Sequence, residues 1–134
     1  MGFRRVEESK EWAQHCTTSS GRAHWVLMTN DVIPDSCNKS WEDQQNLVVK
    51  YKEQGYKLLS VIDAATCLLL EYVETGRRFY TDSPYRYTRC VEGVTIDHLG
   101  EVPLAVGNFA PRGLCLDYNL GRCGAHGVGL ARVF

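Results

Sequence analysis

The sequence predicts a single α+β domain over residues 1–134, with a small antiparallel sheet packed against two or three helices. Its 134 residues, 44% hydrophobic and 23% charged, fit one globular domain with one core. Helix-type apolar spacing recurs before residue 77, whereas residues 79–134 hold short strand-like runs separated by Gly and Pro. A strand, a helix and a strand in that order also favour a layered α and β arrangement.

The first forty residues predict one helix, one strand and a loop. Residues 3–16 place apolar side chains on roughly one helical face, and the TTSSG stretch at 17–21 ends that helix. Residues 24–29, HWVLMT, form an apolar run that is too short for a free helix and predict a strand. Residues 30–39 contain a proline and several turn formers, so we expect a loop there.

The strongest helix signal covers residues 41–54. Ser40 is the expected N-cap and Asp43 stands at the N3 position, a weak form of the capping box. Apolar residues then recur at helical spacing, and Gly55 supplies the stop.

A strand over 56–62 and a second helix are expected next. Asp63 is the predicted N-cap of a helix over 64–75, which Gly76 ends. This start places Cys67 in about the first helical turn. The remaining strands are expected near 86–96, 102–109, 113–118 and 127–133.

Charge and hydropathy exclude several classes of protein. The net charge of −1 excludes a strongly basic footprint for nucleic acid, and we interpret Arg77, Arg78, Arg86 and Arg89 as a solvated surface. No apolar run reaches the ~20 residues of a membrane span. The opening residues show no secretory signal, so we expect a cytoplasmic location and six reduced cysteines.

His24 and Cys67 are the candidate catalytic pair. A thiol nucleophile needs a lowered pKa, which a neighbouring imidazole or a helix N-terminus can supply. Cys67 has the predicted helix N-terminus, and His24 lies at the start of a strand that could pack beside that helix. Cys90 and Cys115 are weaker candidates, because both lie in strand-like segments. Inert structural roles for His24 and Cys67 remain the alternative.

The stretch His24-Trp25-Val26-Leu27, followed by Asn30-Asp31, resembles the H-box of the lecithin–retinol acyltransferase-like proteins. The H-box/NC proteins have a permuted papain-type fold, and the kobuvirus- and parechovirus-like picornaviral 2A proteins are similar to the same group. The resemblance implies His24 as general base and Cys67 as nucleophile. It also implies the 2A roles in viral RNA replication and host-factor contact.

The chain departs from the family pattern around the cysteine. Thr66 stands where the family has Asn before the cysteine, and Leu68-Leu69-Leu70-Glu71 replaces the usual Glu-His-Phe-Val. Asp31, Asp35 and Asn38 are the nearest candidates to polarise the histidine. We therefore predict a 2A-like protein without catalysis, acting through host proteins or viral RNA, with a Cys–His acyltransferase or lipid hydrolase as the alternative.

The C-terminal cysteines suggest a further alternative, a zinc-stabilised RNA-binding module. Cys115, Cys123 and His126 have the spacing C-x7-C-x2-H, which resembles the first half of a CCCH zinc finger with Tyr118 as a base-stacking platform. A structural zinc needs four ligands, so Cys90 or His98 would have to complete the shell. The other interpretation is a closing strand whose glycines mark turns and whose cysteines pack beside it.

Overall fold

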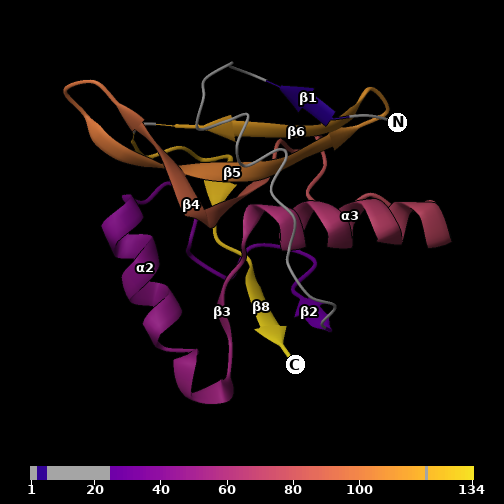
Figure 1. Ribbon diagram of the computed structural model, residues 1–134, viewed down its shortest axis with the longest axis horizontal. Helices are drawn as coiled ribbons and strands as arrows, with labels where there is room; N and C mark the ends of the chain where they lie inside the picture. The colour runs from indigo at the N-terminus through magenta and orange to yellow at the C-terminus, as the bar shows by residue number, and fades with distance from the viewer. Residues whose placement is uncertain (1–2, 6–24, 120) are drawn as a thin grey trace.

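The computed structural model describes residues 3–5, 25–119 and 121–134, which form an α+β fold of helices and two sheets (Figure 1). The predicted fold class is confirmed. The helices are α2 (Trp41–Val49), the 3-10 turn η1 (Lys52–Gln54) and α3 (Val61–Thr75). The strands are β1 (Phe3–Arg5), β2 (Val26–Met28), β3 (Lys57–Leu58), β4 (Tyr87–Ile96), β5 (Gly100–Ala110), β6 (Gly113–Tyr118), β7 (His126–Gly127) and β8 (Leu130–Val133).

The larger sheet has the strand order β1-β6-β5-β4-β7, and the smaller sheet has the order β2-β8-β3. Strands β4, β5 and β6 form an antiparallel meander, as their short connections predict. The sheet is nevertheless mixed, because β1 pairs in parallel with β6 and β7 in parallel with β4. The smaller sheet lies below the larger one, and α3 runs between them on one side (Figure 1).

The main core lies between α3 and the larger sheet. Buried Ala64 and Leu68 of α3 share one apolar cluster with Leu104, Val106 and Phe109 of β5. Burying an aliphatic or aromatic side chain of this size stabilises the fold by about 1.5–3 kcal/mol. The helix that carries Cys67 is therefore held on the sheet by its apolar face. No helix in the described part of the chain is both long and apolar enough to cross a membrane.

Helix α2 begins as the sequence predicts. The Ser40 side chain accepts a hydrogen bond from the Asp43 amide at 3.1 Å. The helix ends earlier than residue 54, and η1 continues it to Gly55, which has a left-handed φ of 84°. Its Val48 belongs to a second apolar cluster with Ile33, Val128 and Leu130.

The predicted start of α3 is wrong. Ser60 is the N-cap, accepting from the Asp63 amide at 3.1 Å, so Asp63 stands inside the first turn. The strand expected over 56–62 is correspondingly reduced to β3, while Gly76 ends the helix as expected, with a φ of 76°. Cys67 is therefore in the second helical turn, beyond the first-turn amides that can activate a thiolate.

The predicted helix over 3–16 is wrong for its first residues and untested for the rest. Phe3–Arg5 forms β1, because it pairs with the free edge of β6, from Leu114 to Leu116. Residues 6–16 lie outside the described residues. A partner distant in sequence decides the structure of such a short segment.

Candidate functional site

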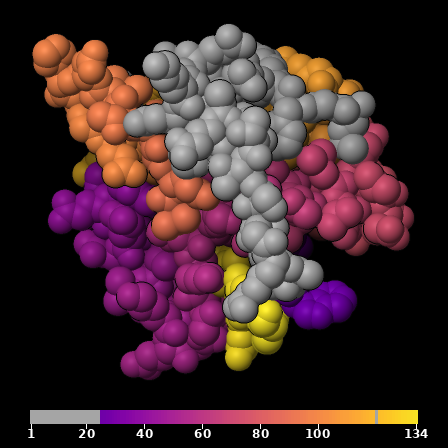
Figure 2. Space-filling view, in the orientation of Figure 1, coloured from indigo at the N-terminus to yellow at the C-terminus, as the bar shows by residue number. Residues whose placement is uncertain are grey.

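A groove between β2 and α3 is the site where the structure brings the predicted functional segments together. Its volume is about 320 Å³. In the space-filling view, α3 lies above β2, which is drawn in indigo beside the yellow C-terminal strand (Figure 2). The lining residues are Val26, Met28, Thr29, Asn30, Cys67, Leu68, Leu70, Glu71, Glu74 and Phe79.

The Cys67 thiol lies half-buried in this groove. Burial raises the pKa of the thiol, and the negative charge of Asp63, one helical turn before it, raises it further. Both effects favour the neutral thiol, whereas a nucleophile requires the thiolate. The predicted activation of Cys67 by the helix N-terminus is absent, because α3 begins at Val61 and Cys67 is therefore its seventh residue, in the second turn.

His24 lies outside the described residues, so the predicted pair with Cys67 stays a prediction. The strand that follows it does occupy the expected place, since Val26 and Met28 line the same groove as Cys67. Asp31 is one of the three residues expected to polarise the histidine. Its Oδ1 accepts a hydrogen bond from the Val32 amide at 2.7 Å. Asp35 and Asn38 are turn residues with positive φ angles of 63° and 57°.

The two alternative thiols are both inaccessible. Cys90 is 0% exposed within the main core, and burial raises the pKa of its thiol well above the ordinary value. Cys115 is 1% exposed and receives a hydrogen bond from the Asn108 side-chain amide at 3.7 Å. These two cysteines pack as small apolar residues and cannot attack an external substrate in this conformation.

The proposed zinc ligands are not gathered into one site. The part of the chain that the structure describes has no group of three or more His, Cys, Asp or Glu side chains placed to hold a metal ion. Cys90 lies in the main core, and Cys115 lies in a separate cluster with Tyr87. The His126 ring packs on Tyr87, with ring centroids 4.6 Å apart. Cys123 is half-buried in the connection between β6 and β7, and the zinc assignment stays a prediction.

His126 makes stability depend on pH. It is 2% exposed, and burial together with the positive charge of Arg89 lowers its pKa to about 4 from an ordinary 6.5. Between these values the unfolded chain binds a proton that the folded chain does not, so stability is complete above pH 6.5 and falls as the pH drops toward 4. We expect roughly 3 kcal/mol of stability to be lost over this window, as measured by urea unfolding.

The matched variant is His126→Phe, which keeps a ring against Tyr87 and removes the titrating group. Its unfolding free energy is expected to change less between pH 7 and pH 4 than that of the parent. Equal pH dependence in the two proteins would assign the acid sensitivity to other groups.

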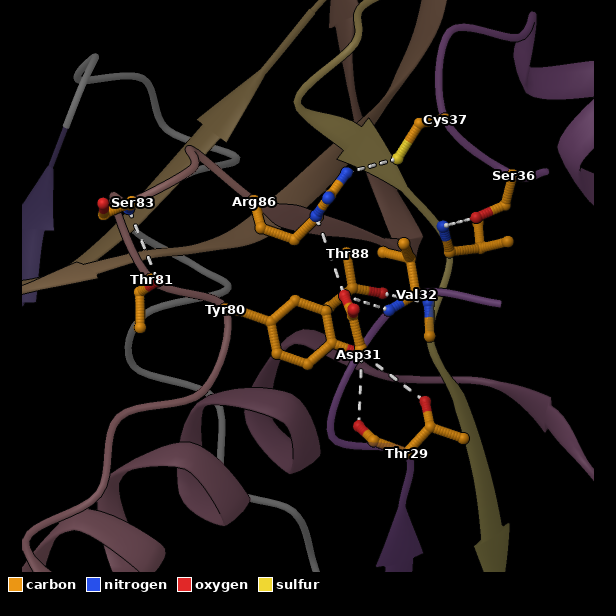
Figure 3. A network of polar contacts seen from close by, with 12 residues as sticks. Thr29, Asp31, Val32, Ser36, Cys37, Tyr80, Thr81, Ser83, Arg86 and Thr88 are labelled. Carbon is orange, nitrogen blue, oxygen red and sulfur yellow. Dashed lines mark hydrogen bonds and ion pairs between the residues drawn. The ribbon is translucent and has the colours of Figure 1, made fainter. Parts of the chain in front are cut away.

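A polar network that joins the loop after β2 to the start of β4 could not be recognised from the sequence (Figure 3). Arg86 Nη1 donates to Cys37 Sγ at 2.9 Å, and its Nε lies 3.7 Å from Asp31 Oδ1. The Tyr80 hydroxyl donates to the Thr29 carbonyl oxygen at 3.2 Å. The network fixes the loop after β2 to the segment before β4 that carries Tyr80 and Arg86.

The predicted solvated surface of four arginines is wrong for Arg89. Its side chain is 1% exposed, and its guanidinium donates to the Gln44 amide oxygen and to the carbonyl oxygens of Lys39, Asn119 and Gly121. The sequence carries no signal of this role, because the residue stands among other arginines.

Comparisons of the chain with protein-family models, with curated proteins and with solved structures return no match.

Proposed function

We propose that the protein acts by binding other macromolecules, as a 2A-like non-structural protein of a picornavirus that contacts host proteins or viral RNA in the host cytoplasm without catalysis. The observation that carries the non-catalytic part is the state of Cys67. Its thiol pKa is raised by burial and by Asp63, opposite to the requirement for a nucleophile. The viral assignment rests on the H-box resemblance of residues 24–31.

An exposed surface on the face of β2 opposite the groove supports a binding role. Trp25 just before β2 and Leu27 within it are 81% and 53% exposed. Phe134 is 66% exposed, and its backbone amide donates a hydrogen bond to the Trp25 carbonyl oxygen. The Arg132 guanidinium lies 5.2 Å from the centre of the Phe134 ring. Trp, aromatic and Arg side chains are the types that dominate the energy of protein interfaces.

A Cys–His acyltransferase or hydrolase is the second candidate, and one observation favours it. The strand that follows His24 and the helix that carries Cys67 line the same groove, as the H-box resemblance requires. A catalytic function would need the thiol to become more acidic when His24 and substrate are in place.

Thiol labelling decides between the two candidates. We expect iodoacetamide to label Cys67 only above the pH at which a free cysteine reacts, pKa ~8.5, with the same midpoint in the parent and in His24→Ala. Asp63→Asn should move the midpoint to lower pH, because it removes the second cause of the raised pKa. Mass spectrometry of the peptide containing Cys67 separates it from the other cysteines.

A thiolate activated by His24 would give a different labelling result. Labelling of Cys67 near pH 6 in the parent that is lost in His24→Ala would establish a working pair and overturn the non-catalytic proposal. Cys67→Ser would then abolish hydrolysis of an activated ester, which the binding proposal does not expect to occur at all.

A further inference from the structure

We infer that the groove between β2 and α3 binds an extended peptide segment of a partner protein, which adds as a strand to the free edge of β2 and places a basic side chain near Glu74. This inference rests on the proposed binding function and specifies the chemistry of the partner. It follows from the edge of β2 that has no neighbouring strand among the described residues, the apolar floor of the groove and the charge of its helical wall.

The hydrogen-bond pattern shows which edge of β2 is unpaired. The Thr29 amide donates to the Leu130 carbonyl oxygen at 2.9 Å, and the Phe134 amide donates to the Trp25 carbonyl oxygen at 2.9 Å. In an antiparallel ladder, alternate residues face the partner strand, so the amide and carbonyl groups of Val26 and Met28 point away from β8. Within the described residues these groups have no hydrogen-bond partner.

The two residues that carry these groups belong to the groove. Val26 and Met28 line it together with α3, and their side chains pack partly on the main core. An edge strand with free amide and carbonyl groups is a template for one more strand. A compact ligand could fill the groove volume but would leave these groups unpaired, whereas an extended peptide pairs them.

The helical wall is arranged along the direction of a peptide. Leu70, Glu71 and Glu74 follow Cys67 by three, four and seven positions, which places all four residues on one face of α3 over two turns. Leu70 is 57% exposed. With Phe79, also in the lining, this wall offers apolar contact to every second side chain of an added strand.

Charge selects a basic side chain on the peptide. Glu71 already binds Arg77, with 2.7 Å between Oε1 and Nη2. Glu74 is exposed and forms no ion pair among the residues that the structure describes. An incoming Lys or Arg would be attracted by the Glu74 carboxylate, whereas an acidic side chain at the same place would be repelled by it.

The experiment uses the full chain and a phage-displayed library of random peptides of about nine residues, a length that spans the three-residue strand with flanks. Enriched peptides are synthesised with a fluorescein label, and their affinities are measured by fluorescence anisotropy. We expect sequences that alternate apolar residues and carry at least one Lys or Arg.

N-methylation tests for an added strand. In the synthetic peptides, N-methylation of the amides that pair with β2 is expected to weaken binding about tenfold, and N-methylation of the intervening amides less than about twofold. Peptides equally insensitive to both patterns would overturn strand addition.

Two matched pairs of variants locate the site. Val26→Pro removes one edge amide that β8 does not use and is expected to weaken binding about tenfold, whereas Val26→Thr keeps the amide and the branched shape. Glu74→Lys should weaken binding of the basic peptides about tenfold, and Glu53→Lys, the same change on exposed η1, should leave it unchanged. Circular dichroism establishes folding, and if Val26→Pro is unfolded, the methylated peptides and Glu74→Lys decide the question.

Two other results would contradict the inference. Enrichment of the same peptides on Glu74→Lys would place their site elsewhere, and a dimer of the parent that Val26→Pro dissociates would make a second copy of the chain the occupant. Either leaves the labelling result for Cys67 unaffected. If Cys67 is unreactive and no peptide binds, only the inference about this groove is wrong. If Cys67 is reactive, the proposed non-catalytic function is wrong as well.

Discussion

Arg89→Met is expected to destabilise the fold by about 3–5 kcal/mol, because it removes the donor that joins three separate segments of the chain. The guanidinium of Arg89 lies 2.9 Å from Gln44 Oε1 and 2.6 Å from the Gly121 carbonyl oxygen. The variant leaves the buried Gln44 amide oxygen without its donor and releases the Gly121 carbonyl oxygen, which lies nearer the surface. Burying the guanidinium charge costs free energy in the parent, and the variant avoids this cost. The expected loss of unfolding free energy is therefore smaller than the sum of four hydrogen bonds from a charged donor.

Urea unfolding at neutral pH measures this change. The matched control is Arg112→Met, which alters the same residue type at an exposed position and is expected to change stability by less than about 0.5 kcal/mol. Arg89→Lys should fall between the two, because an ammonium group keeps the charge but cannot reach acceptors on opposite sides. Equal stability of Arg89→Met and Arg112→Met would show that the contacts of Arg89 contribute nothing net.

Gly107→Ala is expected to cost about 4 kcal/mol or more, since its β-carbon has no space to occupy. A β-carbon at this position would overlap the Arg86 carbonyl oxygen and lie 2.8 Å from Tyr87 Cα. Both neighbours are backbone atoms at the start of β4, the strand that pairs with β5. Tyr87 pairs with Gly107 there, and the Asn108 amide donates to the Arg86 carbonyl oxygen. The two strands would have to separate.

Gly124→Ala is the matched control, because no atom lies within 4 Å of the β-carbon it would add. Thermal unfolding should show a large loss of stability for Gly107→Ala and little change for Gly124→Ala. A Gly107→Ala protein as stable as the parent would show that β4 and β5 can move apart at this point without cost.

The elements that the sequence predicts best are those whose signals are local. Ser40 and Gly76 act at helix ends through the chain immediately beside them, and both have their expected roles. The start of α3 is harder to predict, because Ser60 and Asp63 are both good N-caps three residues apart. Burial of Val61 within the helix favours the earlier start, and burial depends on the whole fold.

The candidate site could be predicted only in part. The sequence indicates that the strand after His24 could pack beside the helix of Cys67, and Val26 and Met28 of that strand do share a groove with Cys67. The electrostatic state of Cys67 depends on its depth and on Asp63, which the misplaced helix start concealed. Burial of Arg89 depends on carbonyl groups from Lys39 and Gly121, which no local pattern can reveal.

The smaller sheet has a consequence for the rate of folding. Its central strand, β8, joins β2 to β3, and the paired residues Thr29 and Leu130 are 101 positions apart. Closing so long a loop costs chain entropy before any contact compensates for it, and folds dominated by such distant pairings acquire their structure slowly. Until β8 docks, β2 and β3 have no neighbour in their sheet, so the groove wall that β2 provides is expected to form among the last steps of folding.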